Sequence, residues 1–296
     1  MKNDYVIFTD ASADILPAGV GKPGIRTIPM EYTFGEESRI CQGAEQASFM
    51  KEFYDGQRKG GLTRTSLISP QSYEEYFSAA LEEGHSVLYL SLSSGLSGTY
   101  NASCMVASEL KEKYKDLDII CVDTLSATAG MGVLISLAVQ NRENGMSIRE
   151  NADFLENARH TLCHWFMVDD LMYLKRGGRL PAATAAIGAA LGIKPILMID
   201  KDGRLENFAK ERGAKSGLKY LVKLYDHSSE KKQGETICIV HADNDSGADY
   251  LEQAIKELNP TANISRVMLS PIIGAHTGPG MCAVVNFGDV SKGLKA

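Results

Sequence analysis

Short apolar runs alternate with amphipathic stretches through the first half of the chain. The apolar runs predict buried strands, and each is followed by a segment with helical spacing. The expected strands are 5–8, 28–34, 87–90 and 118–122. The expected helices are 69–83, 97–114 and 127–144. Strands that alternate with helices are typical of a mostly parallel sheet with helices on both faces.

The second half of the chain has a less regular pattern. Ser147 and Glu150 form a capping box that predicts a helix over 147–162. Asp202-Gly203 lies between two apolar runs, which predicts a β-hairpin. The other expected strands are 164–168, 236–241, 264–268 and 281–287, and the other expected helices are 182–191, 214–227 and 246–258. The fold class is therefore α/β. We expect two α/β domains, one over 1–160 with the serine-rich loop and one over 161–290 with the histidine loop.

The amino-acid composition and net charge of the chain argue against several classes of function. The 296 residues are 44% hydrophobic and 23% charged, with a net charge of −6. This acidic balance gives no reason to expect nucleic acid as a partner. No apolar run is long enough for stable membrane insertion, and no signal peptide is apparent at the N-terminus. The six scattered cysteines lie mostly in apolar runs and form no C-x-x-C pair, which favours free thiols and a cytoplasmic location.

A serine-rich loop over 93–99 joins an expected strand to an expected helix. It contains Ser93, Ser94 and Ser97 together with two glycines. Ligands of open α/β sheets bind at the carboxyl ends of the strands. The start of the helix adds free N–H groups, so the loop suits a phosphate or a carboxylate. A helix start that is simply capped would have the same sequence, and the loop alone leaves both interpretations open.

The same loop also allows a catalytic interpretation. Residues 95–99 nearly match the G-x-S-x-G nucleophile elbow, with Ser97 at the centre and Thr99 in place of the last glycine. His276 follows in the chain order that such an enzyme requires. A serine hydrolase that uses Ser97 and His276 is therefore the alternative function.

Further polar residues could bind an anion. Thr65 and Ser66 precede a helix, where they could cap it or face a ligand. His276 and Thr277 lie in a Gly/Pro-rich segment over 274–280 that predicts a turn. Three arginines lie at loop or junction positions where they could bind an anionic group or remain solvated: Arg176, Arg179 and Arg212.

Metal and nucleotide chemistry have little support in the sequence. His160 and His164 are four residues apart and would share one helix face, but no third ligand accompanies them. The chain has no G-x-x-x-x-G-K-[ST] motif, so we expect no ATP hydrolysis by this chain alone and no metal or other cofactor.

Six motifs, taken in order, resemble those of the DegV family of bacterial fatty-acid-binding proteins. They are 9–17, Thr65-Ser66 with Ser69-Pro70, 93–100, 170–179, 194–197 and 274–280. The resemblance implies two α/β domains with a lipid tunnel between them and one long-chain fatty acid, such as palmitate, as the ligand. The small-residue segment 182–191 could line that tunnel or serve for close helix packing.

The resemblance also implies roles for single residues. Thr65 and a serine of the Ser93–Ser94 pair, of which we favour Ser94, are expected to hold the carboxylate with His276. Ser66, Ser97 and Thr277 complete the candidate set. The family further implies a non-catalytic subunit that presents its fatty acid to a separate ATP-dependent fatty acid kinase, which forms an acyl phosphate. Arg212, Arg176 and Arg179 would support that partnership. Gly213-Ala214 departs from the family pattern after Arg212.

Overall fold

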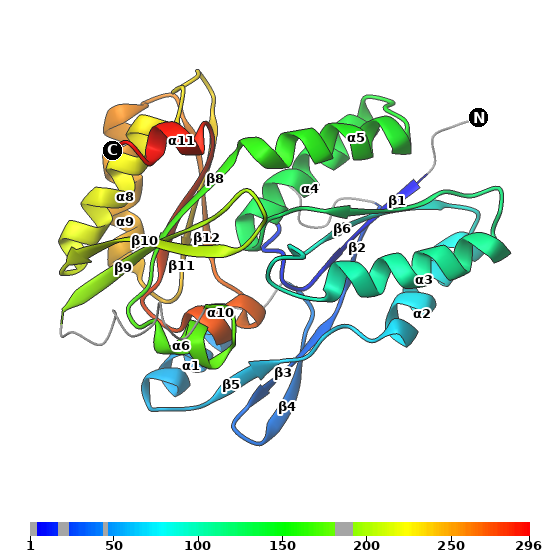
Figure 1. The fold of residues 1–296 in the computed structure, drawn as a ribbon, viewed down its shortest axis with the longest axis horizontal. Helices are drawn as coiled ribbons and strands as arrows, with labels where there is room; N and C mark the ends of the chain where they lie inside the picture. Colours follow the sequence, from blue (N-terminus) through cyan, green and yellow to red (C-terminus); the bar gives the residue numbers. More distant parts are fainter. Residues whose placement is uncertain (1–4, 17–23, 44–46, 181–191) are drawn as a thin grey trace.

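The structure is a computed structural model that describes residues 5–16, 24–43, 47–180 and 192–296. Two large β-sheets with helices packed against them dominate the molecule (Figure 1). The segment 182–191, for which we expect a helix, lies outside the described residues. Within the described ranges, no helix is both long and apolar enough to cross a membrane.

The first sheet is fully parallel, with the strand order β2-β1-β6-β7. Its strands are β1 (Tyr5–Asp10), β2 (Ile25–Ile28), β6 (Ser86–Ser91) and β7 (Ile119–Asp123). Helices cover both faces, as the alternating pattern predicts (Figure 1). One face carries α2 (Pro70–Glu82) and α3 (Thr99–Lys113), and the other carries α4 (Thr128–Glu143) and α5 (Ile148–Ala158).

The second sheet is mixed, with the order β10-β9-β8-β13-β11-β12. Only β11 and β12 pair in parallel, and the other neighbours are antiparallel. Its strands are β8 (Leu162–Met167), β9 (Ile193–Ile199), β10 (Leu205–Arg212), β11 (Thr236–His241), β12 (Asn263–Met268) and β13 (Cys282–Phe287). Helices α8 (Ala214–Ser228), α9 (Asp245–Leu258) and the short α11 (Val290–Gly293) pack on one side of it. The domain boundary near residue 160 stays a prediction.

A small antiparallel sheet, β4-β3-β5, lies apart from the two large ones, and of its three strands only β3 falls within a predicted strand. It consists of β3 (Met30–Phe34), β4 (Glu37–Cys41) and β5 (Thr63–Thr65). The single strand predicted over 28–34 is therefore wrong. Pro29, which lacks an N–H donor, separates β2 from β3, and the chain leaves the large sheet there. Three more helices are near this sheet: α1 (Ala47–Arg58), α6 (Met172–Arg176) and α10 (Pro271–Thr277).

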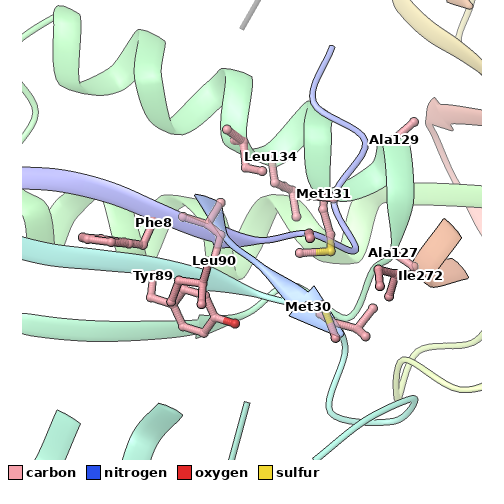
Figure 2. Close-up of a cluster of buried hydrophobic side chains, with 14 of the residues drawn as sticks. Phe8, Met30, Tyr89, Leu90, Ala127, Ala129, Met131, Leu134 and Ile272 are labelled. Atoms are coloured by element: carbon pink, nitrogen blue, oxygen red, sulfur yellow. The ribbon is translucent and has the colours of Figure 1, made fainter. Parts of the chain in front are cut away.

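Side chains alternate across the second sheet and divide the core. Trp165 and Met167 point into a cluster beneath α8 and α9. Phe166 and Val285 point the other way, into a larger cluster that continues through the first sheet. Figure 2 shows part of this larger cluster, from Tyr89 and Phe8 on the strands to Leu134 on α4. One hydrophobic core therefore spans the space between the two large sheets.

Two local predictions, the capping box and the hairpin, are confirmed, and the predicted end of the helix after the capping box is wrong. The capping box of Ser147 and Glu150 is present, and β9 and β10 form the predicted hairpin with Gly203 at φ 73°. The helix of the capping box ends earlier than predicted. His160 lies in a 3₁₀ turn (Arg159–Thr161) and His164 in β8, so the two histidines share no helix face. The described residues also contain no group of three or more metal-ligating side chains.

Leu134→Ala should lower the free energy of unfolding by about 3 kcal/mol, because it leaves a cavity in the core. Leu134 is 0% exposed, whereas Leu258 on α9 is 39% exposed and serves as the matched control. Urea unfolding of both variants measures the difference. Equal losses for Leu134→Ala and Leu258→Ala would contradict the assignment of Leu134 to the core.

Candidate functional site: a cavity between the two sheets

A cavity that is partly open to solvent lies against the inner face of the second sheet. Its walls come from the second sheet, the small sheet, the segments that follow β6 and β7, and helices α4, α6 and α10. Most of the lining is apolar, including Leu92, Phe166, Leu174, Ile199, Leu205 and Ile273. Met30, Ala127 and Ile272 also line it and belong to the core cluster of Figure 2.

One end of the cavity carries a pair of polar side chains from distant parts of the chain. Thr65 Oγ1 lies 2.8 Å from His276 Nε2, a hydrogen bond across 211 residues. Thr65 is at the end of β5, where it pairs with Tyr32 of β3. His276 is on α10, so the turn predicted over 274–280 begins only at Gly278. Both residues line the cavity.

The start of α10 is held by a buried carboxyl group. Asp14 Oδ1 accepts a hydrogen bond of 3.1 Å from the backbone N–H of Ser270, the N-cap residue of the helix. Pro271 follows at the first helical position, which its fixed φ angle favours. Burial raises the pKa of Asp14 to about 7. The loop after β1 therefore positions the helix that carries His276.

His276 is neutral at physiological pH. Burial lowers its pKa to about 4, and the positive charge of Arg179 contributes to the shift. Its Nδ1 is buried and makes no hydrogen bond to a described residue. A Cβ added at Gly177 would lie 2.2 Å from that nitrogen, so glycine is required for the ring to occupy this place. If Nε2–H donates to Thr65, the hydroxyl proton of Thr65 is free to bond a ligand.

Arg179 is the only charged residue among the described residues that line the cavity. Its Nε donates to the carbonyl of Leu96 at 3.1 Å, and its Nη1 donates to the carbonyl of Gly177. None of its described bonds is to a carboxylate. Burial lowers the pKa of this half-buried guanidinium. A partly buried cation without an acidic partner favours an anion at this end of the cavity.

The serine-rich loop contributes Ser97 to the cavity. Ser97 lines the wall, and its Oγ lies 2.7 Å from Oγ1 of Thr99. Ser93 is buried and donates to the carbonyl of Gly203 at 2.7 Å, so its hydroxyl joins the loop to the β9–β10 hairpin. Ser94 is exposed and lies outside the lining. The geometry therefore favours Ser97 where the sequence analysis favoured Ser94.

The remaining candidates divide between the cavity and the surface. Ser66 and the buried Thr277 line the cavity. Arg176 is exposed and stacks over the Tyr173 ring at 4.6 Å. Arg212, at the end of β10, is also exposed and is not part of the lining.

The hydrolase alternative gains no support from these contacts. His276 Nε2 bonds to Thr65, and Ser97 bonds to Thr99, so the described hydrogen bonds do not join Ser97 to His276. A nucleophile and its base should be within hydrogen-bond reach of one another.

Sequence analysis missed two polar residues of the cavity. His164 and Thr128 line it, at a distance along the chain from the other polar residues. His164 was expected at the start of the strand 164–168, but its side chain was considered only as a metal ligand. The period-two pattern of Leu162, His164 and Phe166, which places all three on one face of β8, is the signal that could have located it.

The fold and the cavity define an α/β protein with a mainly apolar cavity that carries a Thr–His pair and an arginine. Residues 4–288 match the family model described as "Uncharacterised protein, DegV family", and the chain belongs to the DegV family. A DegV domain-containing protein of Clostridium perfringens is 38% identical over 288 residues, which cover 97% of this chain and 99% of that protein.

Solved structures show the same fold. A fatty-acid-binding DegV family protein from Thermus thermophilus has a TM-score of 0.85 at 26% identity, and the match covers 96% of this chain and 99% of that one. A DegV lipid-binding protein from Thermotoga maritima has a TM-score of 0.81 at 26% identity, and the match covers 96% of this chain and 98% of that one. The fatty acid kinase B3 protein of Streptococcus pneumoniae, loaded with linoleic acid, shares the fold, with a TM-score of 0.84 at 18% identity. The match covers 97% of this chain and 100% of that one.

The buried state of His276 predicts a pH effect on stability. Its folded-state pKa of about 4 is below the usual value of 6.5, so the unfolded chain binds the extra proton as the pH falls below 6.5. Between pH 7 and pH 5 the wild type should therefore lose about 2 kcal/mol relative to His276→Gln. Urea unfolding at both pH values measures this. Parallel losses in the two proteins would contradict a buried neutral His276.

Proposed function

We propose that this protein binds one long-chain fatty acid, with the acyl chain in the cavity and the carboxylate at its polar end. Thr65, His276, Ser97 and Arg179 are the proposed ligands of the carboxylate. Ser66 and Thr277 complete the surroundings. The observation that carries the proposal is a half-buried guanidinium without an acidic partner beside a Thr–His pair, at one end of an otherwise mainly apolar cavity. The fatty acid binding of the related DegV family protein from Thermus thermophilus agrees with it.

The energetics of an acyl chain support this ligand. Each CH₂ group removed from water contributes about 0.8 kcal/mol, so a sixteen-carbon chain supplies on the order of 12 kcal/mol before the costs of association. The carboxylate opposes burial unless donors meet its oxygens. The hydroxyls of Thr65 and Ser97 supply neutral donors, and Arg179 supplies a charge whose guanidinium is already shared with two carbonyls.

The proposed ligands also suit transfer of the fatty acid to an enzyme. Three of them, Thr65, Ser97 and His276, are neutral, and Arg179 already donates to two backbone carbonyls. A carboxylate bound in this way keeps more of its nucleophilicity than one held in a full ion pair. We propose that the protein presents the carboxylate to a separate ATP-dependent kinase, which forms an acyl phosphate. The exposed Arg212 and Arg176 would contact that partner.

The first test is the lipid content of the purified protein. We expect denaturation to release about one equivalent of a C14–C18 fatty acid, detected by mass spectrometry. A protein that carries no lipid and takes up no added palmitate would refute the proposal.

The carboxylate ligands are tested by a pair of variants. Thr65→Val removes one hydroxyl with little change in shape and should weaken palmitate binding roughly tenfold, because it leaves a charged oxygen without a donor. Ser94→Ala is the control and should bind as the wild type does, since Ser94 lies outside the cavity lining. Affinities come from titration of delipidated protein with a fluorescent fatty acid. A loss in Ser94→Ala with none in Thr65→Val would reverse the assignment.

The kinase partnership gives a separate prediction. Arg212→Ala should reduce acyl phosphate formation by a DegV-partner kinase and ATP at least fivefold, while fatty acid affinity stays unchanged. Arg204→Ala, an exposed arginine at the nearby hairpin, is the matched control. Equal turnover in both variants would remove Arg212 from the partner surface.

A further inference from the structure

Two of the six cysteines differ from the others in their surroundings. Cys104 on α3 and Cys121 on β7 are only partly buried. The other four are fully buried: Cys41, Cys163, Cys238 and Cys282. Burial raises the pKa of Cys163, Cys238 and Cys282 to about 12, so these thiols stay protonated at neutral pH. Thiol chemistry in the folded protein is therefore expected at Cys104 and Cys121.

The packing of α3 on the first sheet brings these two cysteines together. Cys121 pairs with Tyr89 on β6, so both side chains lie on the same face of the sheet. Helices α2 and α3 cover that face. The hydroxyl of Tyr73 on α2 lies 3.0 Å from that of Tyr89 and donates to the carbonyl of Thr99, in the first turn of α3, at 3.2 Å. Cys121 therefore faces the beginning of α3, where Cys104 follows Thr99 by about one and a half turns.

The side chains of Cys104 and Cys121 are in hydrogen-bond contact. The hydrogen bond from Cys121 stabilises a thiolate at Cys104 and lowers the pKa of Cys104 to about 6, although partial burial opposes the shift. The same hydrogen bond, together with burial, raises the pKa of Cys121. The hydroxyl of Tyr100, one turn earlier on α3, also bonds to the sulfur of Cys104. A nucleophilic thiolate and a protonated thiol therefore lie side by side.

This arrangement favours oxidation of the thiols over metal binding. No third metal-ligating side chain joins the two thiols within the described part of the chain, whereas a structural zinc site needs four ligands. Cysteines that sense oxidants have a low pKa, are accessible to solvent and lie next to a second cysteine that resolves the oxidised form. Cys104 and Cys121 have all three properties.

We propose that Cys104 and Cys121 are a modification site, a dithiol that a hydroperoxide oxidises to an intramolecular disulfide. The Cys104 thiolate attacks one oxygen of the peroxide and becomes a sulfenic acid, while the O–O bond breaks and the other oxygen leaves, with one proton, as water or an alcohol. The sulfur of Cys121 then attacks that of Cys104. The S–O bond breaks, and the hydroxyl group leaves as water with the Cys121 proton. The two sulfurs lose two electrons in all, and the peroxide gains them.

The disulfide would lie beside the serine-rich loop. This loop leads directly into α3, which carries Cys104. The backbone N–H of Ser94 donates to Asp123 Oδ1 at 3.1 Å, and Asp123 is two residues beyond Cys121 at the end of β7. A bond between the two sulfurs would therefore join the helix and the strand that support the loop. The chemistry of the dithiol does not depend on the proposed function.

The test is treatment of the reduced full-length protein with a small excess of hydrogen peroxide at neutral pH. We expect the intact mass to fall by about 2 Da, because one disulfide forms with the loss of two hydrogens. The denatured product should contain four titratable thiols in place of six. A proteolytic digest should contain a peptide that joins Cys104 to Cys121, and dithiothreitol should reverse each change.

Single variants separate the two roles. Cys121→Ser removes the resolving thiol, so Cys104 should proceed to the sulfinic acid with a mass gain of about 32 Da. Cys104→Ser should consume peroxide at least tenfold more slowly than the wild type, because it lacks the thiolate. Cys238→Ala, at a fully buried position, is the control and should form the disulfide as the wild type does.

Two results would overturn this inference: a wild-type digest without the linked peptide, or equal rates of oxidation in Cys104→Ser and the wild type. Both leave the proposed function intact, because neither measures fatty acid binding. Conversely, a protein that binds no fatty acid but forms the disulfide would refute the proposed function alone.

Discussion

The alternation of side chains along β8 and β13 is the constraint on which the rest of the structure depends. Each residue of these strands must face either the α8–α9 layer or the first sheet. Trp165 fills the outer layer, and Phe166 faces the inner one. Helices α8, α9 and α11 pack on one side of the second sheet. On the other side the start of α4 packs against His164. The cavity lies on that side and is lined by residues of the second sheet, the small sheet and the segments that follow β6 and β7.

Much of this architecture follows from the chain pattern, and what does not has a physical reason. Apolar runs identify most strands of the large sheets, and the Asp-Gly hairpin and the capping box formed as predicted. β2 was missed, because only the last of its four residues is buried. The small sheet was missed because β4 and β5 are short and mostly exposed, so neither has an apolar run. α10 was taken for a turn because glycine and proline surround His276, although Ser270 and Pro271 are a typical helix start.

The candidate site was predictable in its residue types and not in its geometry. Thr65 and His276 are 211 residues apart, so no spacing rule could have shown that they share a hydrogen bond. The choice among the serines depends on the β9–β10 hairpin, which is also distant in sequence. Ser93 donates to the carbonyl of Gly203, Ser94 is exposed, and Ser97 lines the cavity. The strand that carries His164 was predicted, but the spacing between His160 and His164 was considered only for metal binding, so the place of His164 in the cavity was missed.

The cavity has two polar places, one at Thr65, His276 and Arg179 and one at His164 beside Ser126. They differ in how they affect the free energy of the folded protein. At the first, a guanidinium is already half-buried in the protein, so an arriving anion relieves an unfavourable charge. At the second, His164 and Ser126 satisfy each other, so this place presents no charge to a ligand. Among the described residues of the lining, Arg179 is the one cation that a charged group could meet. In the proposed complex, this difference in charge would set the direction in which the acyl chain lies.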